Sequence, residues 1–340
     1  MNNKLQKYLP YRDGKRFFNE QGETFNNVFG HTALMFLHLI KNYNSRKPKD
    51  PAQWLQPDIP PTRSEELVVT WIGHASFLLQ VDNINILVDP TFNSSSCLFP
   101  RILPPGLQPD QLPPVDFILL SHNHRDHMDR KSLRDIFAHN PKVQFLVPLG
   151  DKAWFKRYGY PLSQVTEHNW WEDKIFTNIT FTFLPTYHWS QRWIFDRNKS
   201  LWGSWMIQVG GATIYFGGDT ANWDHFQQIA HHFPVIDVAL MPIGPCEPRS
   251  WMEKAHLSPE QAGDAFLQLN AKHFIPMHWG TFYFGIDYYE QPLKRLMQWW
   301  KLNTDKLVNK ELHLNKMGQQ FRPYTPQHDL RDSIHNILEI

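Results

Sequence analysis

The segment Val115-Asp-Phe-Ile-Leu-Leu-Ser121-His122-Asn123-His124-Arg125-Asp126-His127 is the most informative stretch of this 340-residue sequence. An apolar run of strand length leads directly into three histidines and one aspartate. Imidazole nitrogens and carboxylate oxygens are ligands that zinc accepts. Side chains two residues apart on extended backbone point to the same side, so we expect His122 and His124 to hold one metal ion. Asp126 and His127 follow the turn and are expected to hold a second.

Three further metal-binding side chains lie in the same kind of position, just after an apolar run with the length of a strand. They are His188 after residues 180–184, Asp219 after residues 212–216, and His278 after residues 272–277. Functional sites of open α/β sheets lie at the carboxyl ends of the strands. Each residue alone has an ordinary interpretation, as a buried histidine, a turn former or a strand cap. Together with the first motif they complete seven ligands for two metals.

The surrounding sequence predicts two similar halves built from strands and helices. Residues 76–88 and residues 204–216 each contain two apolar runs separated by a two-residue turn, and each leads to an aspartate. The run Ser258-Pro-Glu-Gln261 is a capping-box signature, which begins an amphipathic helix. Strands that alternate with helices indicate an α/β fold built in layers.

The order His-x-His-x-Asp-His, then His, Asp and His, resembles that of the metallo-β-lactamase superfamily. The resemblance implies an αββα sandwich, in which two mixed β-sheets are flanked by helices. It also divides the candidate ligands between two metals that Asp219 bridges: His122, His124 and His188 for the first, and Asp126, His127 and His278 for the second. The iron-dependent redox branch usually has glutamate where this chain has His124. The resemblance therefore implies two Zn²⁺ ions and hydrolysis.

Further motifs resemble one branch of that superfamily, the N-acylphosphatidylethanolamine-hydrolysing phospholipases D. They are His188-Trp-Ser-Gln-Arg192, Leu201-Trp-Gly-Ser-Trp205, Gly217-Gly-Asp-Thr220, Pro242-Ile-Gly-Pro-Cys-Glu-Pro-Arg249, His256-Leu-Ser-Pro-Glu260 and His278-Trp-Gly-Thr281. The similarity spans residues 65–322. It implies a zinc-dependent phosphodiesterase that converts N-acylphosphatidylethanolamine to N-acylethanolamine and phosphatidic acid by means of a metal-bridging hydroxide.

Some residues are expected to act in the reaction, and others to support the ligands. The residues expected in catalysis are Asp126, Asp219, Arg192 and His256. A leaving alkoxide needs a proton or a cation, which Arg192 or His256 would supply, although a surface ion pair is an equally ordinary interpretation of Arg192. His74 and Asp89 are expected beside the ligands, because a buried carboxylate that accepts the free N–H of a ligand histidine fixes its tautomer.

The sequence divides into an extension, a catalytic domain and a tail. Residues 1–64 form an N-terminal extension with an apolar helix at residues 28–40 and a proline-rich connector, residues 65–322 form the domain, and residues 323–340 form the C-terminal tail. The apolar stretch is shorter than the roughly 20 residues that span a bilayer. It is expected to pack on the domain, with an interfacial helix on a membrane or a homodimer contact as the alternatives.

Composition excludes several classes of protein. The chain has 34 basic and 33 acidic residues, so it lacks the excess positive charge that nucleic-acid binding needs. Two cysteines cannot form a disulfide framework, and they fit a reducing compartment. The first twenty residues lack the apolar core of a secretory signal. We therefore expect a cytoplasmic protein, with peripheral membrane association as an alternative.

The substrate is expected to be a phospholipid or another phosphodiester. Aromatic residues close to His188 suit a groove that faces lipid, although core packing explains the same residues. One alternative is a hydrolase of this fold that acts on a soluble phosphodiester or a lactone. A second, of another class, is a metal-binding scaffold without catalysis. Activity on dispersed lipid and the amount of bound zinc would separate these three interpretations.

Overall fold

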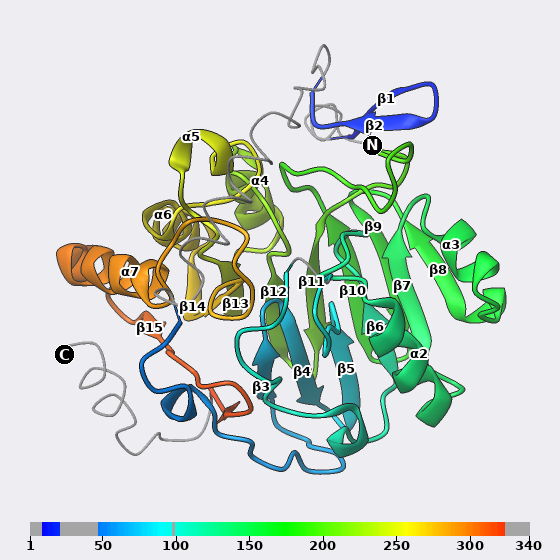
Figure 1. Cartoon of the computed structure of the whole chain (residues 1–340), viewed down its shortest axis with the longest axis horizontal. Coiled ribbons are helices and arrows are strands. Elements are labelled where there is room, and N and C mark those ends of the chain that lie inside the picture. The colour runs from blue at the N-terminus through cyan, green and yellow to red at the C-terminus, as the bar shows by residue number, and fades with distance from the viewer. Residues whose placement is uncertain (1–8, 21–46, 97–98, 324–340) are drawn as a thin grey trace.

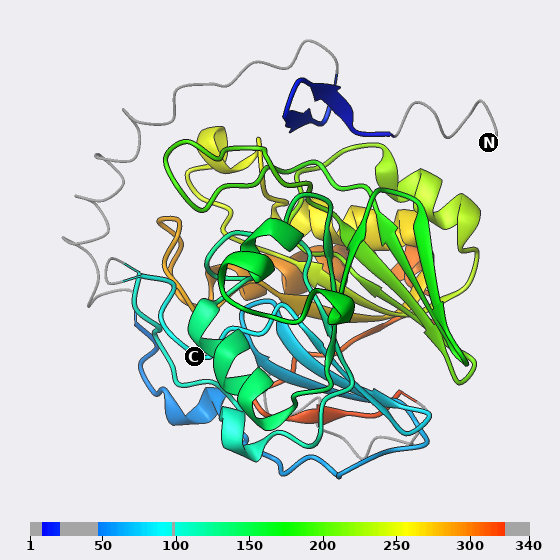
Figure 2. The same ribbon diagram turned by 90° about the vertical axis from the view of Figure 1, so that its right-hand side faces the viewer.

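The computed structural model describes residues 9–20, 47–96 and 99–323. Two seven-stranded sheets form the body of the molecule, and helices cover their outer faces (Figure 1, Figure 2). The predicted α/β fold of two mixed sheets flanked by helices is therefore confirmed. The predicted apolar helix at residues 28–40 and the tail beyond residue 323 lie outside the described residues.

The N-terminal sheet holds the first ligand motif. Its strands, in spatial order, are β16 (Gln320–Phe321), β3 (Val68–Gly73), β4 (Ser76–Val81), β5 (Ile84–Val88), β6 (Phe117–Leu119), β7 (Gln144–Pro148) and β8 (Val165–His168). The pairs from β16 to β5 are antiparallel, and the pairs from β5 to β8 are parallel. The long proline-rich stretch at residues 100–114 is a connection that contains one short 3₁₀ helix, η4 (Pro109–Gln111).

The C-terminal sheet has the same succession of antiparallel and parallel pairs, although all its strands are consecutive in the chain. Its strands, in spatial order, are β9 (Glu172–Phe176), β10 (Ile179–Leu184), β11 (Ser204–Val209), β12 (Ala212–Phe216), β13 (Ile236–Pro242), β14 (Ala271–Met277) and β15 (Glu311–Leu312). The pairs from β9 to β12 are antiparallel and those from β12 to β15 are parallel. The prediction of two similar halves is confirmed, since β4–β5 and β11–β12 occupy equivalent places in the two sheets.

The turns of these two hairpins explain why the halves fold alike. Asp82 and Asn83 have φ angles of 51° and 61°, and Gly210 and Gly211 have φ angles of 57° and 78°. Positive φ at both central residues is the geometry of the turn that suits the twist of an antiparallel hairpin, and Asn, Asp and Gly adopt it most readily. Both hairpins therefore end at the same edge of the molecule, where Asp89 and Asp219 follow.

Alternation along each strand divides the core into layers. In β6, Phe117 faces the other sheet, whereas Ile118 faces outward and packs with Leu133 and Ile136 of α2. The outer helices of this sheet are α2 (Arg130–His139) and α3 (Lys152–Arg157), and those of the other sheet are α4 (His225–His232), α5 (Arg249–Met252), α6 (Pro259–Leu269) and α7 (Gln291–Leu302). Ser258 and Gln261 form the predicted capping box at α6.

The smaller elements lie around this sandwich. They are the hairpin β1 (Tyr11–Asp13) and β2 (Arg16–Phe18), and the 3₁₀ helices η3 (Ala52–Trp54), η5 (Leu162–Gln164) and η6 (Thr304–Lys306). The β1–β2 hairpin lies at the edge of the molecule where the carboxyl ends of the parallel strands lie (Figure 1). In the part of the chain that the structure describes, none of the helices has the length and apolar character to cross a bilayer.

Candidate metal centre

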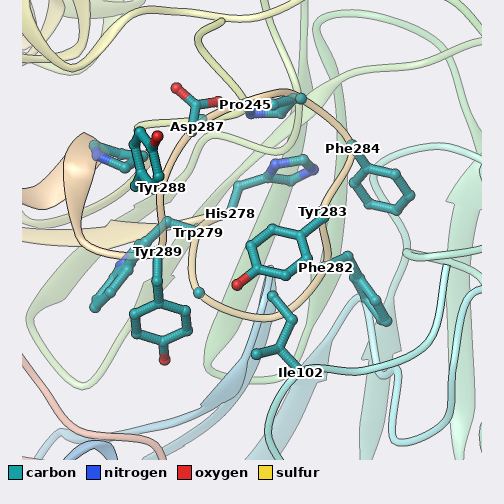
Figure 3. A pocket seen from close by; sticks show the side chains of 14 residues that line it. Ile102, Pro245, His278, Trp279, Phe282, Tyr283, Phe284, Asp287, Tyr288 and Tyr289 are labelled. Carbon is teal, nitrogen blue, oxygen red and sulfur yellow. The ribbon is translucent and has the colours of Figure 1, made fainter. Parts of the chain in front are cut away.

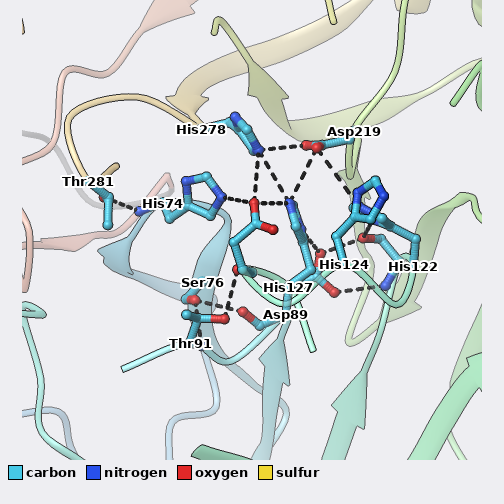
Figure 4. Close-up of polar contacts among 12 residues, drawn as sticks. His74, Ser76, Asp89, Thr91, His122, His124, His127, Asp219, His278 and Thr281 are labelled. Carbon is cyan, nitrogen blue, oxygen red and sulfur yellow. Dashed lines mark hydrogen bonds and ion pairs between the residues drawn. The ribbon is translucent and has the colours of Figure 1, made fainter. Parts of the chain in front are cut away.

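The seven residues predicted as ligands lie together at the carboxyl ends of strands from both sheets. They follow β6, β10, β12 and β14; five of them are buried, and His124 and Asp126 are intermediate in burial. Figure 4 shows His122, His124, His127 and His278 arranged around the carboxylate of Asp219. The two sheets end side by side here, which brings residues from distant parts of the sequence to one place.

One group of donors contains His122, His124, His188 and Asp219, with one donor atom from each within 4.8 Å of the others. His124 Nδ1 lies 2.8 Å from His122 Nε2 and 3.3 Å from His188 Nε2. Asp219 Oδ2 lies 3.6 Å from His188 Nε2 and 3.9 Å from His122 Nε2. Tetrahedral zinc with bonds of 2.0–2.1 Å separates its donor atoms by about 3.3 Å, so these spacings fit a small divalent metal.

A second group contains Asp126, His127 and His278, together with His74. His127 Nε2 lies 3.2 Å from His278 Nε2 and 3.3 Å from Asp126 Oδ2. The same carboxylate, Asp219, reaches this group too, because its Oδ2 is 3.3 Å from His127 Nε2 and its Oδ1 is 3.0 Å from His278 Nε2. Asp219 is thus in contact with both groups of donors.

The protonation states of these side chains fit a cation. Burial lowers the pKa of His124 to about 4 and that of His188 to about 3, so both imidazoles are neutral at pH 7 and retain a free lone pair. Burial raises the pKa of Asp219, but the imidazoles of His278 and His127 lower it further, and the net pKa is well below the usual range. Neutral imidazoles and ionised carboxylates are the forms in which these groups bind metals.

His127 shows how strongly the cluster favours positive charge. Burial lowers its pKa, yet the carboxylates of Asp219 and Asp126 raise it well above the ordinary value of a histidine. A cation held by these carboxylates would replace the proton on His127, so the residues present fit a bound metal.

The two residues predicted beside the ligands lie in contact with them. Asp89 follows β5, and its Oδ2 is 2.7 Å from His127 Nδ1, while its Oδ1 accepts a hydrogen bond from the backbone N–H of Ser121 at 2.7 Å. His74 lies in the turn between β3 and β4, with its Nε2 2.9 Å from Asp126 Oδ2. Through these contacts, Asp89 orients the His127 ring and His74 orients the Asp126 carboxylate.

His256 lies at the edge of the same cluster. Its Nδ1 is 3.8 Å from Asp219 Oδ2, and its ring centroid is 5.4 Å from those of both His188 and His278. With a side-chain exposure of 16 %, it is more accessible than the rings around it. Burial lowers its pKa to about 3. The ring is therefore neutral at pH 7 and keeps one N–H that can donate a hydrogen bond.

Arg192 contacts the backbone of the first ligand motif. Its Nη1 donates to the carbonyl of Asn123 at 2.8 Å and to that of Met128 at 2.7 Å, so one nitrogen joins both ends of the turn. The guanidinium also lies over the ring of Trp154, with 5.2 Å between its central carbon and the ring centroid. These contacts favour a positioning role, in which Arg192 holds the turn, over the predicted role at the leaving group.

Sequence reasoning missed one residue of the N-terminal extension. Asn19 follows the β1–β2 hairpin and is 4 % exposed. Its Oδ1 accepts from the backbone N–H of His188 at 3.1 Å, and its Nδ2 donates to the His188 carbonyl at 3.0 Å. The imidazole ring of His188 has a separate contact, because the Ala255 carbonyl lies 2.9 Å from its Nδ1. An asparagine 169 residues away carries no sequence signal for such a contact.

Comparison with known proteins agrees with this geometry. Residues 84–279, more than half of the chain, match the family model of the β-lactamase superfamily domain. The chain belongs to the metallo-β-lactamase superfamily. It is a metal-dependent hydrolase of this superfamily, and the His- and Asp-rich groups described above are its candidate metal-binding clusters.

Several members of the superfamily are similar over most of the chain. An N-acyl-phosphatidylethanolamine-hydrolyzing phospholipase D of Caenorhabditis elegans is 33 % identical over 85 % of this chain and 87 % of its own length. A mitochondrial enzyme of the same name from Saccharomyces cerevisiae is 32 % identical over 67 % of this chain and 50 % of its own length. The structure of a metallo hydrolase from Ignicoccus hospitalis, 19 % identical, has a TM-score of 0.57 and covers 75 % of this chain and 97 % of its own. This last likeness reflects the fold alone.

Proposed function

We propose that this protein is a zinc-dependent phosphodiesterase of the phospholipase D type, which hydrolyses N-acylphosphatidylethanolamine. Water adds to phosphorus, the bond from phosphorus to the ethanolamine oxygen breaks, and the alkoxide takes a proton. The products are N-acylethanolamine and phosphatidic acid. The similarity to the Caenorhabditis elegans phospholipase D supports this choice of substrate.

The observation that carries the proposal is the position of Asp219 between two groups of donors. It lies within 3.6 Å of His188 on one side and within 3.3 Å of His127 on the other. We assign His122, His124, His188 and Asp219 to one zinc ion, and Asp126, His127, His278 and Asp219 to another. Zinc bound there would lower the pKa of water towards about 7 and would neutralise charge on a phosphoryl group.

His256 is the protein group best placed to contact the substrate. It stands at the accessible edge of the cluster, and its neutral ring keeps an N–H for a phosphoryl or leaving oxygen. We therefore propose that His256 donates a hydrogen bond to the reacting phosphodiester. Arg192 has a positioning role, because its guanidinium stabilises the turn between His122 and His127 through hydrogen bonds to two backbone carbonyls.

An exposed apolar loop beside the site supports a lipid substrate. The loop tip contains Trp193, Ile194 and Phe195, which are 54 %, 73 % and 80 % exposed. The guanidinium of Arg125, which belongs to the ligand motif, lies 5.5 Å from the centroid of the Trp193 ring. Adjacent exposed aromatic and aliphatic side chains next to arginine suit the surface of a bilayer with anionic headgroups. We propose peripheral membrane association through this loop.

A pocket next to His278 offers a second apolar surface. Its wall includes Trp279, Phe282, Tyr283 and Phe284, and the imidazole of His278 lies beside the rings of Tyr283 and Phe284 (Figure 3). The volume of this pocket is about 30 Å³, which holds about one water molecule, so it is too small for an acyl chain.

The test is a panel of substrates incubated with zinc-loaded protein, with the products identified by mass spectrometry. It contains dispersed N-acylphosphatidylethanolamine, phosphatidylcholine, a short soluble phosphodiester and a lactone. We expect N-acylethanolamine and phosphatidic acid, with higher turnover on the dispersed lipid than on the soluble compounds. Faster hydrolysis of the soluble diester or the lactone would overturn the lipid assignment. Less than one equivalent of bound metal, together with no hydrolysis, would indicate a scaffold instead.

A further inference from the structure

A third group of metal-binding side chains lies away from the centre described above. It contains His273 in β14, Glu311 in β15 and His313 directly after β15. Strand β14 joins the two places, since His273 is near its start and His278 follows its end. Five residues of extended chain separate them by roughly 16 Å. The group is therefore distinct from the proposed dinuclear centre.

The donor atoms of this group have the spacing of a single metal site. His273 Nδ1 lies 3.0 Å from His313 Nε2. One carboxylate oxygen, Glu311 Oε2, lies 3.5 Å from His313 Nε2 and 3.9 Å from His273 Nδ1. The three separations surround the value of about 3.3 Å that tetrahedral zinc imposes on its ligands. Small side-chain rotations would equalise them.

The backbone holds two of the three residues side by side. β14 and β15 are parallel neighbours in which His273 is paired with Glu311. The backbone N–H of His313 then donates to the carbonyl of Phe274 at 2.8 Å, which continues the pairing by one more residue. Alternate residues of an extended chain share one side, so Glu311 and His313 both reach towards His273. The sheet thus sets the positions of the three donors before any metal binds.

Packing fixes the two rings while leaving the carboxylate open to solvent. The ring of Phe321 lies 4.0 Å from that of His313 and 5.5 Å from that of His273, measured between centroids. The two histidine side chains are 13 % and 11 % exposed, whereas that of Glu311 is 48 % exposed. An ion can therefore approach from the Glu311 side and meet two imidazoles that are already oriented.

We propose that His273, Glu311 and His313 bind one divalent transition-metal ion of the zinc class, with a fourth position open to water. A simple hydrogen bond between the two rings would explain the short nitrogen–nitrogen distance. It would not explain why the same carboxylate oxygen approaches both ring nitrogens. Two imidazoles and one carboxylate are a ligand set that zinc accepts. The bound ion would connect β14 to β15 and stabilise this edge of the C-terminal sheet.

The experiment counts bound zinc in the full-length protein and needs no substrate. Protein is stripped with a chelator and dialysed against a series of free zinc concentrations, and zinc per chain is measured by elemental analysis. We expect His273→Ala and His313→Ala each to bind one equivalent less than the unchanged protein at saturation. Glu311→Gln, an isosteric change at an exposed position, is expected to weaken that equivalent by at least about tenfold. The control is His139→Ala, at the exposed end of α2.

Two results would overturn the proposal. One is a saturation value for the unchanged protein equal to that of the His313→Ala variant at every zinc concentration. The other is an additional equivalent that persists with unchanged affinity in Glu311→Gln and in both histidine variants, which would place the extra zinc elsewhere. If an alanine variant fails to fold, Glu311→Gln alone decides between these outcomes. A rise in melting temperature on zinc addition that the Glu311→Gln variant lacks would support the site independently.

Discussion

The side-chain amide of Asn19 pairs with the backbone of His188 in both directions. Its Oδ1 accepts from the His188 N–H at 3.1 Å and its Nδ2 donates to the His188 carbonyl at 3.0 Å. The indole N–H of Trp202 donates to the same Oδ1 at 3.0 Å. All three residues are buried. The segment after the β1–β2 hairpin is therefore part of the support of a candidate metal ligand, although it precedes the predicted catalytic domain.

Replacing Asn19 should weaken both the fold and the metal centre. Asn19→Ala removes the side-chain partners of the buried His188 backbone N–H and carbonyl, and each group left unpaired costs about 1–3 kcal/mol. We expect the free energy of unfolding to fall by roughly 2–4 kcal/mol and zinc affinity to decrease. Chemical denaturation and zinc titration measure the two effects. Asn19→Asp keeps the hydrogen-bond acceptor but loses the donor, so its free energy of unfolding should lie between those of the unchanged protein and Asn19→Ala. Equal stability of all three proteins would contradict this role.

Removing the shared charge at Asp219 should abolish turnover. Asp219→Asn keeps the shape of the side chain but removes the carboxylate charge that contacts both groups of donors. We expect kcat to fall by at least about 100-fold while circular dichroism reports a folded domain. His139→Ala, at the exposed end of α2, is the matched control and should change kcat little. Near-normal turnover of the Asp219→Asn variant would argue against a dinuclear centre.

The two possible roles of Arg192 predict different kinetics. If Arg192 positions the ligand turn, Arg192→Ala leaves the carbonyls of Asn123 and Met128 without their donor, so zinc occupancy and kcat should decline together. If Arg192 instead acts on the leaving group, kcat should fall while zinc occupancy stays unchanged. We expect the first pattern. Arg192→Lys retains the charge but lacks the planar fork of donors, and it should recover only part of the occupancy.

The apolar loop should act on lipid surfaces only. Changing Trp193, Ile194 and Phe195 to serine removes exposed side chains, each of which would contribute up to about 1.5–3 kcal/mol when buried. We expect binding to vesicles that contain anionic phospholipid to weaken by at least about tenfold. Turnover of a soluble phosphodiester should stay the same. Ile175→Ser, at an exposed position of β9, is the control; unaltered vesicle binding by the triple variant would contradict the membrane role.

Asp151 should make the stability of the protein depend on pH. Burial raises its pKa to about 7, even though Ser200 and Asn123 form hydrogen bonds with it. The folded protein keeps this proton between about pH 4 and pH 7, whereas the unfolded chain loses it, so stability declines as pH rises through this range. Asp151→Asn removes the effect. Relative to the unchanged protein, the variant should gain about 2–3 kcal/mol between pH 5 and pH 7 in denaturant titrations; parallel pH profiles would contradict this prediction.

The fold and the main cluster were accessible from sequence because their signals are local. The runs at residues 76–81, 84–88, 204–209 and 212–216 coincide with β4, β5, β11 and β12. Apolar runs of this length and two-residue turns depend on neighbouring residues alone. All seven candidate ligands are histidines or aspartates that follow a strand end by one to eight residues, and a sheet brings its strand ends to one edge.

Contacts between segments that are distant in the sequence could not be predicted from these local signals. Asn19 and His188, or Arg192 and Met128, meet only because two seven-stranded sheets stack with a particular strand order. The motif around Arg192 placed it near a ligand, but the contacts of its guanidinium with the Asn123 and Met128 carbonyls depend on packing.

The sequence by itself determined the α/β architecture, the two equivalent hairpins and the set of residues able to bind metal, because periodicity and turn chemistry act over a few residues. Tertiary structure alone decided which of those residues lie close enough together to share an ion. It brought Asp219 between two groups of histidines, and it placed His273 beside His313 through the parallel pairing of β14 and β15. Burial then lowered the pKa of His188 and raised that of Asp151, and burial is a property of the packed molecule alone.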